Sequence, residues 1–178
     1  MDPATPSISY HPVQPITEHT MHTQNATEII PRIWLGNFMS AKDEQFIRAF
    51  NITTIFNCTK DIPFFIESIP NKYRVPLDDN LEEVEIRNLC QWSVEVAYKI
   101  MSEYKNGKTI LVHCYAGRQR SAACVAIFLI AYYYMHTDNV ITAIRQKRPE
   151  AFMPGANFER AIRYFDSIFH SQILPSIQ

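Results

Sequence analysis

One stretch near the middle of the chain limits what this sequence can fold into. A β-branched and apolar run, Thr109 to Val112, leads into seven residues that hold one cysteine, one glycine and two arginines, and an apolar run from Ala122 to Met135 follows. A strand, a tight loop and a helix start form an anion site, because the first helical turn has unpaired backbone N–H groups. A cysteine thiolate in that loop would be stabilised by the same N–H groups and by a neighbouring arginine.

The spacing of Cys114 and Arg120 suits a loop wrapped around one tetrahedral anion. Backbone N–H groups can point at the anion's oxygens, and the Arg120 guanidinium can bind phosphate through two hydrogen bonds. Cys114 would then lie beneath the phosphorus as an activated nucleophile. Gly117 fits a backbone that turns sharply beside a ligand. The candidate phosphate-binding residues are Tyr115, Ala116, Gly117, Arg118, Gln119 and Arg120.

Attack by a cysteine on a phosphate ester also needs an acid that protonates the leaving oxygen. His113 adjoins Cys114, but successive side chains of a strand point to opposite faces. Asp78 and Asp79 follow an expected strand and are the candidates for this acid. A solvated turn explains the same two carboxylates equally well, so the residues alone leave that choice open.

Composition and charge exclude several functions. The chain has 178 residues, of which 47% are hydrophobic and 20% charged, as in one globular domain. A formal net charge of −1 gives no broad attraction to nucleic acid, so we expect no nucleic-acid partner. The apolar run from Ala122 to Met135 is shorter than the roughly 20 residues of a membrane span. We therefore expect no transmembrane segment.

The four cysteines show neither a paired C-x-x-C spacing nor a metal-ligand pattern. This favours a reducing compartment over a disulfide framework, and the start of the chain does not resemble a signal peptide. We therefore expect a cytoplasmic location, which leaves access to the nucleus open. The residues of the chain indicate no metal site.

Apolar periodicity predicts an α/β domain over residues 28–178, preceded by a flexible arm over residues 1–27 that is rich in proline. We expect a central mixed sheet of about four to five strands flanked by helices, with the anion loop between a central strand and a buried helix. Ser40 and Asn157 are expected to cap helices. The expected strands are 29–35 (a pair interrupted at residue 31), 52–58, 72–77 and 109–113; the expected helices are 41–50, 82–104, 122–135, 139–147 and 158–169.

The central loop resembles that of a known family. The run His113-Cys114-x-x-Gly117-x-x-Arg120-Ser121 is similar to the H-C-x-x-G-x-x-R-[S/T] loop of cysteine-dependent protein tyrosine phosphatases. The chain from about residue 30 to residue 169 resembles the compact dual-specificity branch. Further matching segments are Ile33 to Asn37, Ile52 to Asn57 and Val75 to Asp79.

The resemblance implies a role for each matching residue. Asp79 would be the general acid and later the base for the hydrolytic water, with Asp78 as the alternative. Cys114 would form a cysteinyl-phosphate, and Arg120 would bind the phosphoryl group. Ser121 would hydrogen-bond the departing thiolate, and His113 would help to hold the loop. The resemblance implies neither a metal nor another cofactor.

The expected activity is hydrolysis of phosphotyrosine and of phosphoserine or phosphothreonine in proteins. Two alternatives stay open: the same chemistry on a phosphoinositide or other phospholipid, and an inactive module that only binds phosphate. Arg118 favours the phospholipid alternative. We expect Arg118 and Gln119 to be the residues that decide between a protein and a phospholipid substrate. Where the family commonly has P-N-x-G-F, this chain has Pro154 to Phe158, with its asparagine displaced to position 157. In this superfamily a second cysteine sometimes forms a disulfide with the nucleophile, but Cys58 and Cys124 are expected to pack in the core.

Overall fold

The computed structural model describes residues 23–177, so most of the expected arm lies outside the described residues. The first strand, β1 (Ala26–Ile30), begins two residues before Glu28. Ala26 and Thr27 are fully buried. The expected boundary at residue 27 therefore falls inside a strand.

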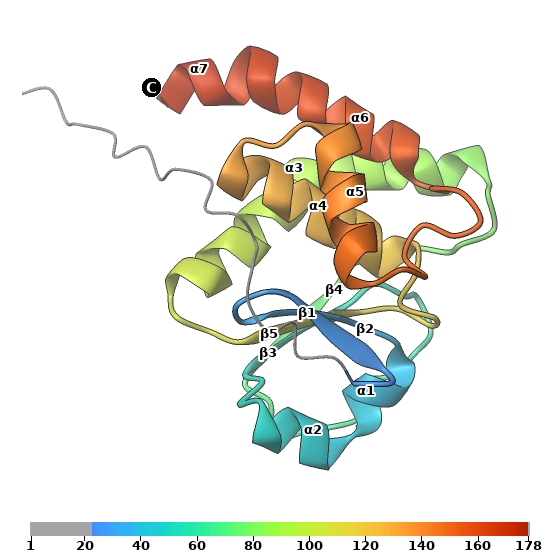
Figure 1. Ribbon diagram of the computed structural model, residues 1–178, viewed down its shortest axis with the longest axis vertical. Helices are drawn as coiled ribbons and strands as arrows, with labels where there is room; N and C mark the ends of the chain where they lie inside the picture. The colour runs from blue at the N-terminus through green and yellow to red at the C-terminus, as the bar shows by residue number, and fades with distance from the viewer. Residues whose placement is uncertain (1–22, 178) are drawn as a thin grey trace, which may run out of the picture.

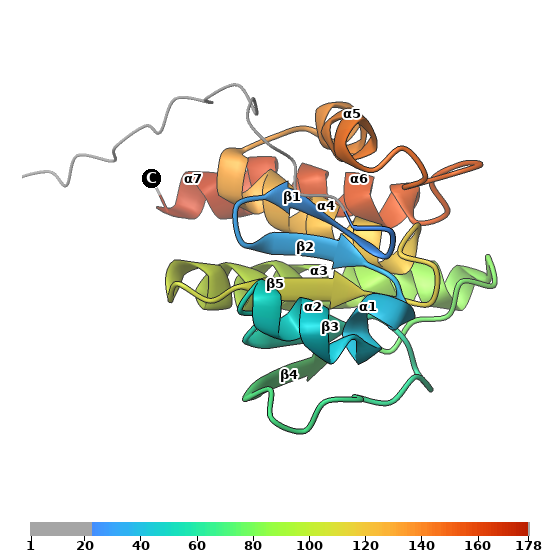
Figure 2. The ribbon, with the colours of Figure 1, turned by 60° about the horizontal axis from the view of Figure 1, so that its bottom comes forward.

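Five strands form one mixed sheet (Figure 1), and Figure 2 shows their order β1-β2-β5-β3-β4. β1 pairs antiparallel with β2, while β2, β5, β3 and β4 run parallel to one another. This is the mixed sheet that the sequence predicts. Its remaining strands are β2 (Ile33–Gly36), β3 (Thr54–Asn57), β4 (Asn71–Arg74) and the central β5 (Ile110–His113).

Helices cover both faces of the sheet (Figure 2). The short helices α1 (Phe38–Lys42) and α2 (Glu44–Ala49) lie on one face. The other face carries α3 (Glu83–Lys105), α4 (Arg120–Tyr133), α5 (Thr137–Lys147) and α6 (Glu159–Ile168), with a π-helical turn η1 (Phe169–Ile173) and α7 (Leu174–Ile177) continuing the last of them.

The single helix expected over residues 41–50 is wrong. Two helices occupy this segment, because Asp43 accepts a hydrogen bond from the N–H of Phe46 and so starts a second helix. The first helix is capped by Asn37, whose side chain accepts from the N–H groups of Met39 and Ser40. Ser40 is therefore a residue within α1 and not its cap.

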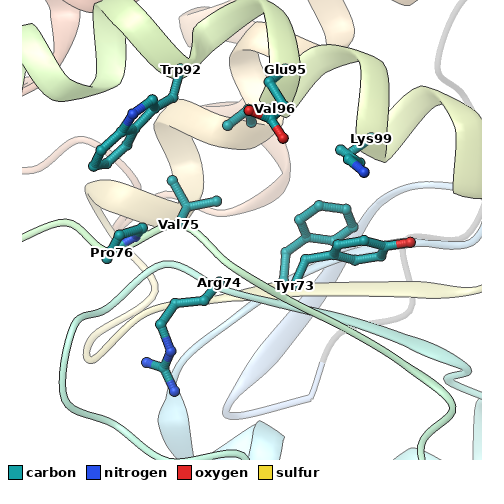
Figure 3. Close-up of a pocket in the computed structure, with 9 residues that line it drawn as sticks. Tyr73, Arg74, Val75, Pro76, Trp92, Glu95, Val96 and Lys99 are labelled. Atoms are coloured by element: carbon teal, nitrogen blue, oxygen red, sulfur yellow. The ribbon is translucent and has the colours of Figure 1, made fainter.

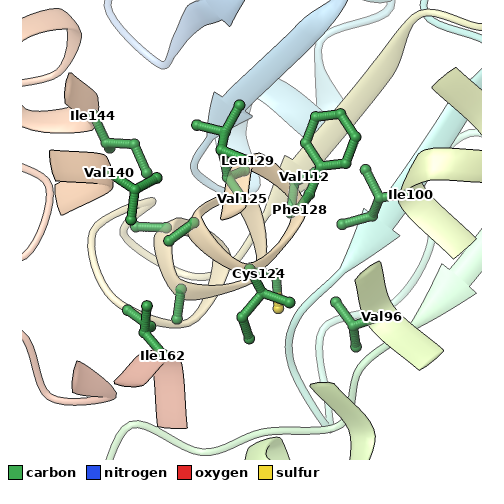
Figure 4. Packing of buried hydrophobic residues seen from close by; sticks show 14 of the residues in the cluster. Val96, Ile100, Val112, Cys124, Val125, Phe128, Leu129, Val140, Ile144 and Ile162 are labelled. Carbon is green, nitrogen blue, oxygen red and sulfur yellow. The ribbon is translucent and has the colours of Figure 1, made fainter. Parts of the chain in front are cut away.

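Side chains of the central strand alternate between two apolar cores. Ile110 and Val112 of β5 face the larger core, whereas Leu111 faces the smaller core under α1 and α2. α4 lies in the middle of the larger core, and every residue from Ser121 to Ala131 is buried (Figure 4). The strand and most of the helix that flank the anion loop are thus enclosed in the core, which gives the loop a rigid base.

Within the described residues, no single helix has the length and apolar composition needed to cross a membrane. α4 and α5 meet that requirement only as a pair, and the chain bends by 119° between them.

Candidate active site

The loop between β5 and α4 places one sulfur atom at its base. Cys114 is 2% exposed, and its Sγ accepts hydrogen bonds from the Gly117 N–H at 3.3 Å and the Ser121 hydroxyl at 3.2 Å. Donors that point at a sulfur stabilise its anionic form. Cys114, Gly117 and Ser121 therefore meet as the sequence predicts.

Three carbonyl groups of the loop are bound from outside it. The Tyr115 carbonyl accepts from the Phe38 N–H at 3.2 Å, and the Arg118 carbonyl accepts from the Phe152 N–H at 2.8 Å. The Gly117 carbonyl accepts from Nε of Arg148 at 2.9 Å. In a trans peptide the C=O and the following N–H point in opposite directions. The N–H groups after these carbonyls, at residues 116, 118 and 119, are thereby turned toward the loop's interior, where they can bind an anion.

Only glycine fits at position 117, because of the backbone conformation there and the close approach of Gly36. The φ of Gly117 is +67°, in the left-handed region. A Cβ at this position would lie 2.6 Å from the carbonyl oxygen of Gly36. No side chain fits between the loop and the end of β2.

Arg148 supports the loop from beneath, and sequence reasoning missed it. It is 2% exposed and binds the Gly117 carbonyl, the Thr27 hydroxyl at 3.2 Å and Glu150 at 3.2 Å. Burial lowers the pKa of this guanidinium, and the charge of Glu150 opposes that shift. Its main partners lie far away in the sequence, so no local pattern marks it as part of the site.

Arg120 links the loop to the segment that carries the candidate acids. Its Nη1 donates to the carbonyl of Leu77 at 3.2 Å, immediately before Asp78. Its Nε is buried and has no hydrogen-bond partner among the described residues. An unsatisfied charged donor next to Cys114 is suited to a phosphate oxygen.

The two candidate acids have different partners. Asp78 forms an ion pair with Lys60 at 2.9 Å, and its backbone N–H donates to Glu85 at 3.0 Å. Asp79 is exposed, and its Oδ1 accepts from Nδ2 of Asn157 at 2.7 Å. Asp78 is thus paired with a cation, whereas Asp79 faces solvent and is bound by a neutral amide.

Gln119 has a structural role that the sequence did not indicate. It is 5% exposed, and its Nε2 donates to the carbonyls of Met153 and Gly155 at 3.1 and 2.7 Å. Its Oε1 accepts from the N–H of Asn157 at 3.0 Å. The Gln119 side chain therefore holds residues 153–157, and these contacts give no support to a substrate-selecting role for it.

The displaced asparagine at position 157 does not cap α6. The residue before that helix is Phe158, with no side-chain capping bond, and Asn157 points its amide at Asp79 instead. Gln119, Asn157 and Asp79 thus form a chain of hydrogen bonds from the phosphate loop to the candidate acid.

Arg118 and Ala116 are exposed in the loop, and Tyr115 is 61% exposed. The Tyr115 ring stacks on that of Phe38, with centroids 5.1 Å apart and planes at 15°. An aromatic pair therefore lies at the rim of the site, next to Cys114.

His113 is 1% exposed, and its Nδ1 lacks a hydrogen-bond partner within the described part of the chain. Burial lowers the pKa of His113 to about 4, and the charges of Arg74 and Arg120 act in the same direction. The imidazole is therefore neutral near neutral pH.

Cys58 and Cys124 are free and fully buried, with their sulfur atoms 3.6 Å apart. Burial, together with the hydrogen bond between the two thiols, raises the pKa of Cys58 well above its usual value. These properties fit core packing, as expected from the sequence.

A pocket of about 240 Å³ lies elsewhere, between the edge strand β4 and helix α3 (Figure 3). None of its lining residues belongs to the phosphate loop or is a candidate acid. They are Phe56, Tyr73, Arg74, Val75, Pro76, Trp92, Glu95, Val96 and Lys99.

The chain belongs to the dual-specificity phosphatase family, since residues 33–168 match the family described as "Dual specificity phosphatase, catalytic domain". It is 31% identical to dual specificity protein phosphatase 2 of Mus musculus, over 68% of this chain and 37% of that protein. It is 29% identical to MAP kinase phosphatase with leucine-rich repeats protein 3 of Dictyostelium discoideum, over 87% of this chain and 18% of that protein. The chain thus spans well under two thirds of the length of these relatives.

Solved structures share the architecture. The crystal structure of human DUSP28 matches with a TM-score of 0.74 and 19% identity, over 86% of this chain and all 100% of that one. The crystal structure of DUSP15 matches with a TM-score of 0.74 and 24% identity, over 87% and 96% of the two chains. These likenesses confirm the predicted α/β fold.

The neutral state of His113 predicts a loss of stability in acid. The unfolded chain takes up a proton on His113 near pH 6.5, whereas the folded protein does so only near pH 4. Between these two pH values the unfolded state binds more protons than the folded state. The free energy of unfolding therefore decreases as the pH falls, by on the order of 3 kcal/mol at pH 4. Urea unfolding of the wild type and His113→Gln, followed from about pH 7 to pH 4, measures this contribution. The variant should lose less stability than the wild type; an equal loss in both proteins would contradict a buried neutral His113.

Proposed function

We propose that the protein removes phosphate from phosphotyrosine and from phosphoserine or phosphothreonine in proteins, through a covalent intermediate on Cys114. One observation carries the proposal: a buried sulfur accepts two hydrogen bonds at the base of a loop whose carbonyls at residues 115, 117 and 118 are bound from outside. This arrangement suits both nucleophilic attack and binding of a phosphoryl group.

In the first step the Cys114 thiolate attacks phosphorus, an S–P bond forms and the bond from phosphorus to the ester oxygen breaks. The inward N–H groups and the Arg120 guanidinium bind the three equatorial oxygens. The carboxylic acid of Asp79 gives its proton to the leaving oxygen. The product alcohol or phenol departs, and the phosphoryl group stays on the sulfur.

In the second step water attacks the same phosphorus and breaks the S–P bond. Asp79, now a carboxylate, takes a proton from that water. Ser121 donates its hydrogen bond to the departing thiolate, in the geometry already present at 3.2 Å. Inorganic phosphate leaves, and the site returns to its starting state without a metal or other cofactor taking part.

The rim of the site supports a peptide substrate. The stacked rings of Tyr115 and Phe38 offer an apolar surface beside the phosphate loop, and Lys42 lies 5.7 Å from the Phe38 ring centroid. Aromatic side chains are enriched at protein interfaces, so this pair can contact side chains that flank a phosphorylated residue. The family membership agrees with a phosphoprotein substrate.

A panel of substrates tests the proposal. Rates on p-nitrophenyl phosphate, on phosphotyrosine and phosphothreonine peptides and on phosphoinositides are compared in the presence of EDTA, with Cys114→Ser as the control. We expect hydrolysis of the aryl phosphate and the peptides by the wild type and none above background by the variant. Faster hydrolysis of phosphoinositides would assign the site to phospholipids, and no hydrolysis at all would make it a binding module.

The contrast between Asp78 and Asp79 gives a second prediction. Asp79→Asn should lower kcat on a phosphothreonine peptide by about 100-fold or more, because a poor leaving oxygen depends on its acid. Asp78→Asn removes the ion pair with Lys60 but leaves the acid in place, so kcat should fall far less. Steady-state kinetics of the two variants decide the assignment, and the opposite ranking would transfer the acid role to Asp78.

A further inference from the structure

Two histidines and an aspartate converge at the C-terminal end of α4, away from the phosphate loop. His136 precedes α5, Asp166 lies in α6 and His170 lies in the π-helical turn η1. One ligand atom from each residue lies within 4.8 Å of the others. α4 has 14 residues, and at about 1.5 Å per residue it separates this cluster from Arg120 by roughly 20 Å.

The spacing of the ligand atoms fits a metal ion. Nδ1 of His136 lies 3.1 Å from Oδ1 of Asp166, and Nδ1 of His170 lies 2.8 Å from the same oxygen. Four ligands at the usual Zn–N and Zn–O distances of about 2.0–2.2 Å stand about 3.3 Å apart at the corners of a tetrahedron. The observed separations need only a small expansion to admit the ion.

The outer partners of the cluster orient these atoms. The second carboxylate oxygen of Asp166 accepts from the backbone N–H and the hydroxyl of Thr137, both at 2.8 Å. Nε2 of His170 lies 3.4 Å from the carbonyl oxygen of Tyr134. Histidines that bind a metal commonly donate their other ring N–H to a carbonyl. Carboxylates that bind a metal commonly accept hydrogen bonds on their second oxygen.

With these outer partners in place, Oδ1 of Asp166 and the Nδ1 atoms of the two histidines face one another. When Nε2 of His170 carries a hydrogen that faces the Tyr134 carbonyl, its Nδ1 needs a proton or a cation to approach a carboxylate oxygen. His136 presents Nδ1 to that oxygen as well, and the two imidazole rings stack with centroids 4.2 Å apart. The two rings are thus held side by side with both Nδ1 atoms directed at one carboxylate.

We propose that His136, Asp166 and His170 bind one divalent transition-metal ion of the Zn²⁺ type. Two imidazole nitrogens and one carboxylate oxygen suit such an ion better than Mg²⁺ or Ca²⁺, which prefer oxygen ligands. A fourth position stays open to water, because His136 has a side chain 67% exposed to solvent. The ion would join the C-terminal helix to the connection between α4 and α5, and so stabilise this end of the domain.

Titration with Zn²⁺ alone tests the site in the full chain. The background protein carries Cys114→Ser, His11→Asn, His19→Asn and His22→Asn, so that the Cys114 sulfur and the three histidines near the N-terminus cannot contribute. Isothermal titration calorimetry should find one Zn²⁺ per chain. His136→Asn and His170→Asn should each weaken binding by at least about tenfold, a loss expected when one of three ligands is removed.

Asp138→Asn is the matched control, because Asp138 is an exposed carboxylate two residues from His136 that bonds Arg163 and not the cluster. It should bind Zn²⁺ like the background protein. His136 is exposed, so its variant is expected to fold, and a circular dichroism spectrum verifies this. Zn²⁺ should also raise the Tm of the background protein and of Asp138→Asn, but not that of His136→Asn. Absence of binding in the background protein, or equal binding in all four proteins, would overturn the proposal.

Discussion

The outward orientation of three loop carbonyls is the constraint on which the site depends. The Phe38 N–H, the Phe152 N–H and the Arg148 side chain each hold one of them. These donors come from two segments, one at residue 38 and one at residues 148–152, so elements on both sides of the loop in the sequence shape it. The fold thereby fixes a ring of inward N–H groups before any phosphate arrives, which is how a protein stabilises charge without reorganising during the reaction.

The candidate acid is tied to this loop by its own set of contacts. Arg120 binds the carbonyl of Leu77 just ahead of the acidic pair, and Gln119 reaches Asp79 through Asn157. Cys114 and Asp79 lie 35 residues apart in the sequence, and these contacts bring their two segments together. Residues of the phosphate loop therefore shape the acid's position as well as the phosphate site.

The sequence predicted those parts of the fold that local patterns determine. The apolar runs gave β3, β5, α3 and α4 to within a few residues, and the loop motif marked Cys114, Gly117, Arg120 and Ser121. The break between α1 and α2 escaped prediction, because it depends on the Asp43 side chain competing for a backbone N–H. Arg148 and the structural role of Gln119 also escaped, because their partners lie more than 30 residues away and follow no local period.

The central claim is that phosphate passes through a covalent bond to Cys114. Rapid acid quenching of the Asp79→Ala variant during reaction with p-nitrophenyl phosphate, followed by peptide mass spectrometry, tests it directly. This variant should accumulate the intermediate, since p-nitrophenolate leaves without an acid but hydrolysis of the thiophosphate lacks its base. We expect one added phosphoryl group on the peptide that contains Cys114. Release of p-nitrophenolate with no phosphoryl group on that peptide would contradict it.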